Sequence, residues 1–247
     1  MARLPFALQL YTVRDHMAKD IPSTLRRVKG AGYDFVELAG TGSCSPAEWK
    51  KLLVETRLTA VSNHFGLEEV TSRPATVVET CKTLGLRYAV VPHANAEDRQ
   101  GWIAIAHALD KAGQFLREAG IRLCYHNHAH EFRQLEGKPA LDWLFDNARP
   151  ENLAAEIDTF WVQYGGSDPV EIIRKYRDRC PLLHVKDMAP EGEKPIFADL
   201  GTGTMDWPRI FQAANGADIA WYIVEQDECR GDSLESARVS AQFMARQ

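Results

Sequence analysis

One short segment of the chain gathers several side chains that bind metals or move protons. Four of them follow directly on the apolar run Ile121–Tyr125, which is typical of a buried strand: His126, His128, His130 and Glu131. Side chains alternate along a strand, so the three histidines share one face if the extended conformation continues, and Glu131 joins them only if the chain turns. Such nitrogen and oxygen ligands suit a divalent metal, whereas the alternative is a loop of hydrogen-bonded histidines.

The elements that position these side chains alternate along the chain. Apolar runs predict strands at Phe6–Tyr11, Asp34–Leu38, Leu58–Asn63, Arg87–Val91, Ile121–Tyr125, Leu153–Ile157, Leu182–Val185 and Ala220–Val224. Helical spacing, with capping residues such as Ser45 and Asp168, predicts helices at Ile21–Ala31, Pro46–Thr56, Pro74–Leu84, Asp98–Ala119, Ala140–Asn147, Pro169–Arg177, Trp207–Ala214 and Ser233–Ala245. A loop is expected from Met188 to Thr204.

Eight strands that alternate with eight helices in 247 residues predict a (β/α)8 TIM barrel in the α/β class. An open doubly wound sheet would carry a glycine-rich phosphate loop after its first strand, and Thr12–Asp15 has no glycine. No linker or change in composition divides the chain, so residues 1–247 are expected to form a single domain.

Composition excludes several classes of function. The net charge of −5 argues against a nucleic-acid groove, which needs clustered Lys and Arg. Five scattered cysteines without a CxxC pair favour reduced thiols, and no apolar stretch reaches the roughly 18 residues of a membrane span. A cytoplasmic protein without a membrane or nucleic-acid partner is expected.

Catalytic groups of a TIM barrel lie at the carboxyl ends of its strands. Each predicted strand ends in, or is followed by, an imidazole, carboxylate or amide: Gln9 with Tyr11, Glu37, His64, His93, His126, Asp158, His184 with Lys186, and Glu225. Any one of these side chains alone is more often structural. Together they are predicted to converge on one pocket.

Within this group, a carboxylate near the fifth strand, Asp158, His184 and Glu225 make a set of three oxygen ligands and one nitrogen ligand. Such a set suits Mn²⁺, Mg²⁺, Co²⁺ or Zn²⁺. A metal that binds adjacent hydroxyl and carbonyl oxygens acidifies the neighbouring C–H, and a nearby carboxylate or imidazole then moves the proton. The residues therefore predict metal-assisted enolisation of a keto-sugar or polyol.

The chain resembles the sugar phosphate isomerase/epimerase superfamily, the xylose-isomerase-like TIM barrels, over nearly its full length. The motifs that carry the resemblance are Gln9–Arg14 (QLYTVR), Tyr125–Phe132 (YHNHAHEF), Glu156–Val162 (EIDTFWV), His184–Asp187 (HVKD), Leu200–Trp207 (LGTGTMDW) and Val224–Glu225. The resemblance implies one divalent ion, often Mn²⁺, held by a glutamate, an aspartate, a histidine and a second glutamate.

Three of these four implied ligands match directly: Asp158, His184 and Glu225. The first glutamate of the ketose 3-epimerases lies inside the fifth strand, where this chain has Tyr125 or His126. We expect Glu131 to replace it, with His126 as the fallback ligand.

This departure bears on the reaction. The leading hypothesis is an isomerase or epimerase of a non-phosphorylated sugar, with Glu131, Glu225, His126 and Lys186 as catalytic residues. The resemblance makes the two metal-bound glutamates the bases of an epimerase. A single His base suits elimination, so the alternative is a lyase or dehydratase of the inosose or 3-keto-glycoside type. Lys186 either stabilises an oxyanion or forms a salt bridge with Asp187 or Glu156.

The substrate is expected to be a small sugar bound by several polar and aromatic side chains: Gln9, Tyr11, His64, His128 and Trp161. His93 is a further candidate. The segment Gly201–Thr204 follows the seventh strand, where barrels often bind phosphate, but Lys194 is the sole cation between Lys186 and Trp207, which argues against a phosphorylated substrate.

Two remaining alternatives are an AP-endonuclease-like enzyme, against which the net charge counts, and a sugar-binding barrel that has lost its metal. Self-association into a homo-oligomer through the long loops is left open.

Overall fold

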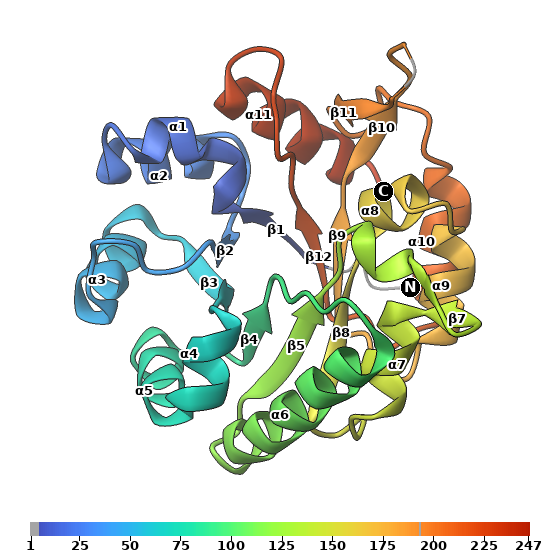
Figure 1. Ribbon diagram of the computed structural model, residues 1–247. Helices are drawn as coiled ribbons and strands as arrows, with labels where there is room; N and C mark the ends of the chain where they lie inside the picture. The colour runs from blue at the N-terminus through green and yellow to red at the C-terminus, as the bar shows by residue number, and fades with distance from the viewer. Residues whose placement is uncertain (1–4, 193) are drawn as a thin grey trace.

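The computed structural model describes residues 5–192 and 194–247. Within these residues, eight parallel strands close into a barrel in the order β1-β12-β9-β8-β5-β4-β3-β2. They are β1 (Phe6–Gln9), β2 (Phe35–Leu38), β3 (Thr59–His64), β4 (Tyr88–Val91), β5 (Arg122–His126), β8 (Leu153–Asp158), β9 (Leu182–Val185) and β12 (Trp221–Val224). Figure 1 shows the helices outside this ring of strands. The predicted TIM barrel is confirmed.

The longer helices follow the sequence signals closely. They are α2 (Ile21–Gly30), α3 (Pro46–Thr56), α5 (Pro74–Leu84), α6 (Arg99–Glu118), α7 (Ala140–Asp146), α9 (Pro169–Lys175), α10 (Trp207–Asn215) and α11 (Ser233–Met244). At α3 the Ser45 hydroxyl and the Glu48 carboxylate form a capping box, and at α5 Gly85 ends the helix with φ +74°. In the described part of the chain, no helix combines the length and the apolar character needed to cross a membrane.

Sequence reasoning missed several short elements. They are η1 (Leu10–Val13), α1 (Arg14–Met17), α4 (Leu67–Ser72), η2 (His130–Phe132), β6 (Gln134–Leu135), β7 (Lys138–Pro139), α8 (Thr159–Tyr164), β10 (Asp187–Ala189) and β11 (Ile196–Ala198). The first predicted strand stops at Gln9, because its side chain accepts a hydrogen bond from the Tyr11 N–H and turns the chain into η1. The expected loop after β9 contains the antiparallel hairpin β10–β11.

The barrel interior changes from apolar to polar along the strands. Val90, Cys124, Ala154 and Leu182, from β4, β5, β8 and β9, form one fully buried apolar cluster. Side chains of a strand return to the same face every two residues, so the next inward positions are His126, Glu156 and His184. The lower barrel is therefore packed with apolar side chains, and the end toward which the strands run carries the chemistry.

Candidate active site

Two overlapping groups of side chains lie close enough to hold a metal ion. The upper set is His126, Asp158, His184 and Glu225, and the lower set is His64, His126, Glu156 and His184. Within each set, one ligand atom per residue lies within 4.8 Å of all the others. Asp158, His184 and Glu225 thus come together as predicted, and His126, the fallback ligand, joins them.

Strand pairing produces the upper set. Asp158 at the end of β8 pairs with His184 of β9, and the Asn127 side chain accepts a hydrogen bond from the Asp158 N–H at 3.0 Å. His184 Nδ1 lies 2.9 Å from Glu225 Oε2, and His126 Nε2 lies 3.6 Å from Asp158 Oδ2. Two imidazoles and two carboxylates therefore face one another above the apolar layer, and this cluster is able to bind a divalent metal.

Glu131 lies apart from both sets, contrary to its predicted role as a metal ligand. The chain does turn after His128, into η2, but the turn directs the Glu131 carboxylate into the protein. Oε1 accepts a hydrogen bond from the Tyr125 hydroxyl at 2.7 Å, and Oε2 accepts one from the His128 N–H at 2.9 Å. Burial raises the pKa of Glu131 to about 7, although the Tyr125 hydroxyl opposes the shift. Glu131 therefore stabilises the loop that carries His128.

Lys186 is almost fully buried against three carboxylates. Its Nζ lies 2.9 Å from Asp158, 2.7 Å from Glu225 and 2.7 Å from Asp227. Burial alone would lower the lysine pKa, but these carboxylates hold it well above its usual value. The ammonium therefore bears a charge beside the upper set. The salt bridge to Asp187 or Glu156, considered from the sequence, is replaced by these three.

Asp187 instead organises the glycine-rich segment that follows β11. Its carboxylate accepts hydrogen bonds from the N–H groups of Gly201 (2.8 Å) and Gly203 (3.2 Å) and from the Trp207 indole (2.8 Å). A Cβ on Gly203 would lie 2.3 Å from Asp187 Oδ1, so the segment needs glycine there. Because these N–H groups already bind a carboxylate of the protein, they are not available to a phosphate.

A cavity of about 350 Å³ opens above the upper set. It is lined by Tyr11, Ala39, His64, Pro92, His93, His126, His128, Glu225 and Asp227. Of the predicted sugar contacts, Tyr11, His64 and His128 lie here. Gln9 and Trp161 do not line it. Gln9 is fully buried and donates to Glu37 at 2.8 Å, and the Trp161 ring, whose centroid lies 5.5 Å from that of His128, borders a different hollow.

The imidazoles of the cluster differ in charge. Burial and the nearby His184 and Lys186 hold the pKa of His126 well below its usual value. Burial and Lys186 lower that of His128 to about 3. Burial would also lower the pKa of His64, but Glu37 and Glu156 raise it to about 9. His126 and His128 are therefore neutral, and each offers a lone pair.

Glu156 and Asp227 are site residues that were not selected from the sequence, and Glu37 was predicted to reach the pocket without a stated role. Glu37 Oε1 lies 2.8 Å from His184 Nε2, and Asp227 contacts Lys186. Glu156 was available from strand periodicity, since it stands two residues before Asp158 and shares its inward face. The signal for Asp227 was weaker, because it lies in a loop after β12.

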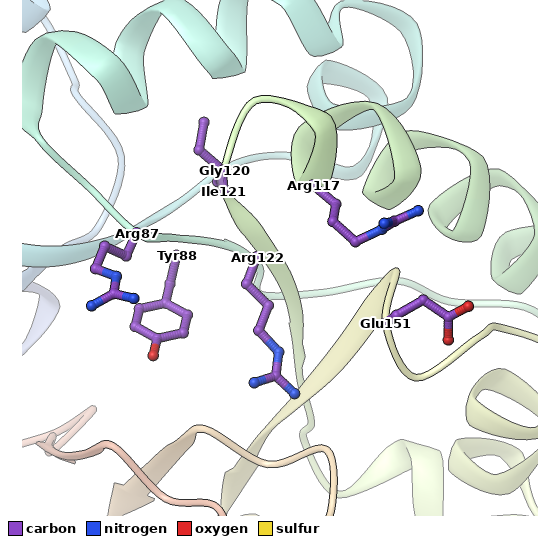
Figure 2. A pocket seen from close by; sticks show the side chains of 7 residues that line it. All are labelled: Arg87, Tyr88, Arg117, Gly120, Ile121, Arg122 and Glu151. Atoms are coloured by element: carbon purple, nitrogen blue, oxygen red, sulfur yellow. The ribbon is translucent and has the colours of Figure 1, made fainter.

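A second hollow lies at the opposite end of the barrel. Its volume is about 420 Å³. Figure 2 shows the residues that line it, from the starts of β4 and β5 and the segments beside them: Arg87, Tyr88, Arg117, Gly120, Ile121, Arg122 and Glu151. Arg117 donates to Asn152 at 3.1 Å, and Arg122 lies 3.5 Å from Asp218. This hollow lacks the imidazoles of the upper end and faces away from the catalytic end of a TIM barrel.

Comparison with known proteins places the chain in a family. The profile of the xylose isomerase-like TIM barrels matches residues 25–247. The chain belongs to this family. The sequence motifs indicated the same xylose-isomerase-like family.

Individual relatives are more distant. An inosose dehydratase of Geobacillus kaustophilus (strain HTA426) is 24% identical, and the match covers 94% of this chain and 88% of that protein. Two further inosose dehydratases are matched over 55% and 52% of their length. Among solved structures, a sugar phosphate isomerase/epimerase of Parabacteroides distasonis ATCC 8503 superposes with a TM-score of 0.86 at 24% identity, covering 98% of this chain and 94% of that one.

Another solved structure, the IOLI protein with a bound zinc atom, has a TM-score of 0.76 at 14% identity and covers 98% of this chain and 97% of that one. At these identities the two structures show a common fold.

Proposed function

We propose that this protein is a metal-dependent lyase that removes water from a non-phosphorylated keto-sugar or keto-polyol. The observation that carries the proposal is the position of Glu131. A two-base epimerase needs a metal-bound glutamate beside the fifth strand, and here the glutamate is held by Tyr125 and the His128 N–H, while His126 occupies the strand end. The similarity to inosose dehydratases supports the same reaction class.

The upper set would hold one divalent ion through His126, Asp158, His184 and Glu225. Two nitrogens and two carboxylates fit Mn²⁺ and also Zn²⁺, and Mn²⁺ is the ion we propose. When bound, such an ion polarises a substrate carbonyl and acidifies the adjacent C–H. The Lys186 ammonium contacts two of these carboxylates, so it would have to move aside and would then face the charge that develops on the substrate oxygen.

Two groups that line the cavity would move the protons. His128 borders the cavity and is neutral, so its imidazole would accept the proton from carbon. Asp227 also borders the cavity, and its carboxylate would pass to the departing hydroxyl a proton taken from the Lys186 ammonium 2.7 Å away. The C–H and C–O bonds break, a C=C bond forms and water leaves.

The presence of two proton-transferring groups in one cavity favours an isomerase or epimerase as the second candidate. His128 follows β5 and Asp227 follows β12, and in this reaction one would remove a proton and the other would return one. The cavity of about 350 Å³ suits a single sugar ring in either case.

Product analysis by NMR in D₂O separates the two reactions. The Mn²⁺-loaded enzyme is incubated with an inosose and with a panel of keto-sugars. Loss of water to an unsaturated ketone is expected, and it should fall by about 100-fold in His128→Gln, as for loss of a general base. Deuterium exchange at carbon without loss of water would reject the lyase and favour the epimerase.

A further inference from the structure

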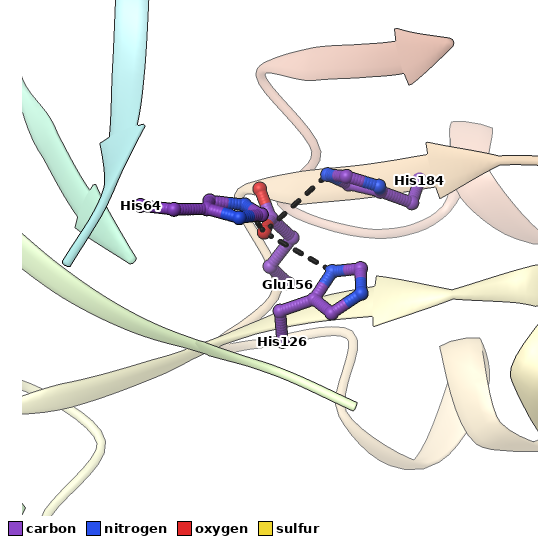
Figure 3. A group of neighbouring side chains, drawn as sticks. All are labelled: His64, His126, Glu156 and His184. Carbon is purple, nitrogen blue, oxygen red and sulfur yellow. Dashed lines mark ion pairs between the residues drawn. The ribbon is translucent and has the colours of Figure 1, made fainter. Parts of the chain in front are cut away.

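The Glu156 carboxylate is fully buried, yet neither of its oxygens accepts a hydrogen bond from any described residue. A buried carboxylate in this state is costly unless a cation or a proton compensates it. Figure 3 shows the imidazoles of His64, His126 and His184 around it, contributed by β3, β5 and β9. The carboxylate is therefore aimed at the centre of the lower set.

Three distances from Glu156 to the surrounding imidazoles match the edges of a zinc coordination tetrahedron. Oε2 lies 3.4 Å from His64 Nε2, 3.3 Å from His126 Nδ1 and 3.4 Å from His184 Nε2. Zinc lies about 2.0–2.1 Å from nitrogen and oxygen ligands, so the edge of its tetrahedron is about 3.3–3.4 Å. A hydrogen-bonded carboxylate would lie closer to a nitrogen, near 2.9 Å. The three nearly equal distances match a shared ion better than they match a hydrogen bond.

We propose that His64, His126, Glu156 and His184 form a tetrahedral zinc position that is distinct from the upper position. Three imidazole nitrogens and one carboxylate oxygen are a ligand set that zinc prefers. A divalent ion there would also balance the charge of Glu156 and of Glu37, whose carboxylate is fully buried beside His64 and His184.

The two positions exclude each other. The lower set uses His126 Nδ1 and His184 Nε2, whereas His126 Nε2 and His184 Nδ1 face the carboxylates of the upper set. A neutral imidazole has one lone pair, so a ring that binds an ion below presents an N–H above. Zinc in the lower position therefore turns His184 Nδ1–H toward Glu225, 2.9 Å away, and closes the upper position to metal.

Lys186 fits this lower-occupied state. Its ammonium contacts Asp158 Oδ2 and Glu225 Oε2, which leaves the upper carboxylates already paired with a cation.

Cobalt in place of zinc tests the proposal without an activity assay, because four-coordinate Co²⁺ absorbs visible light far more strongly than six-coordinate Co²⁺. Glu156→Gln and Asp158→Asn are a matched pair of variants. Each replaces a carboxylate by the amide of the same shape, and the two positions are fully buried and lie two residues apart on β8. The wild type is expected to bind one Co²⁺ with the strong four-coordinate spectrum. Asp158→Asn should keep that spectrum, and Glu156→Gln should lose it, with affinity weakened at least about 100-fold.

His64→Gln supplies a second variant, since His64 belongs to the lower set alone and borders the cavity. It should behave like Glu156→Gln, and circular dichroism verifies that each variant is folded. Retention of the four-coordinate spectrum in a folded Glu156→Gln or His64→Gln, or its loss in Asp158→Asn, would overturn the proposal.

Discussion

The two ends of the barrel are both hollowed, but they differ in how their polar groups are paired. At the end where the strands start, arginines on the surface contact single partners such as Asn152 and Asp218. At the end where the strands finish, buried carboxylates, imidazoles and one ammonium share partners, and the oxygens of Glu156 accept no hydrogen bond from the described chain. The larger hollow is therefore not the one with chemistry. The site is distinguished by buried charged side chains that need a further ion or a substrate as a partner.

The largest effect is expected from the upper set. Asp158→Asn keeps the shape of the side chain and removes a charge that the proposed ion needs. With Mn²⁺ present, kcat/KM for water loss should fall by roughly 1,000-fold or more, because both a ligand and the polarised carbonyl are lost. Initial rates measure this, and an equally conservative change at the other end, Glu151→Gln, is the control.

The next effect concerns the buried ammonium. Lys186→Met leaves Asp158, Glu225 and Asp227 without their cation, so the free energy of unfolding should fall by about 3–5 kcal/mol in metal-free protein. A divalent ion restores part of this loss, and the stabilisation by Mn²⁺ should therefore be larger in the variant than in the wild type. Urea unfolding with and without Mn²⁺ measures both quantities. If Mn²⁺ stabilised the variant and the wild type equally, Lys186 would not compete with the metal ion for these carboxylates.

Glu131 is buried at the same end of the barrel as the metal cluster but does not belong to that cluster. Its folded pKa of about 7 exceeds the usual 4.5, so the folded protein binds this proton more tightly than the unfolded chain. The resulting stabilisation is complete below about pH 4.5 and is lost as the pH rises through 7, a change of about 3 kcal/mol.

Glu131→Gln should remove that pH-dependent component and leave metal content unchanged. Urea unfolding from pH 4.5 to 8 gives the difference between wild type and variant, and Glu118→Gln at the exposed end of α6 is the control. A variant that loses metal would return Glu131 to the ligand set.

The smallest effect is expected at the opposite end. Arg122→Ala removes a partly exposed contact of 3.5 Å with Asp218, and such contacts contribute about 0–1 kcal/mol. Activity should stay within about twofold of wild type. A large loss of kcat would assign the arginine-lined hollow a part in the reaction.

Local signals predicted the fold well because each acts within a few residues. Ser45, Pro46 and Glu48 fixed the start of α3, and Gly85 fixed the end of α5. The signals failed where a side chain has two tasks. Asp158 ends β8 and also caps α8, accepting from the Trp161 N–H at 3.0 Å, so the short helix behind it was not recognised.

The site was predictable to the level of converging strand ends. Asp158, His184 and Glu225 follow from strand order alone. The direction of Glu131 depends on the Tyr125 hydroxyl and on the turn at η2, which no spacing rule reports. The role of Glu156 depends on three imidazoles from other strands, so it can be recognised only in the folded barrel.

The proposed function and the proposed zinc position both require that the cluster around His126 and His184 binds a divalent ion. His184 belongs to both the upper and the lower set, so His184→Gln tests the claim whichever position the ion takes. Metal content after reconstitution with Mn²⁺ or Zn²⁺ and removal of excess, measured by mass spectrometry, should be one ion per chain in the wild type and near zero in the variant. Equal metal content in a folded His184→Gln, or none in the wild type, would contradict the account.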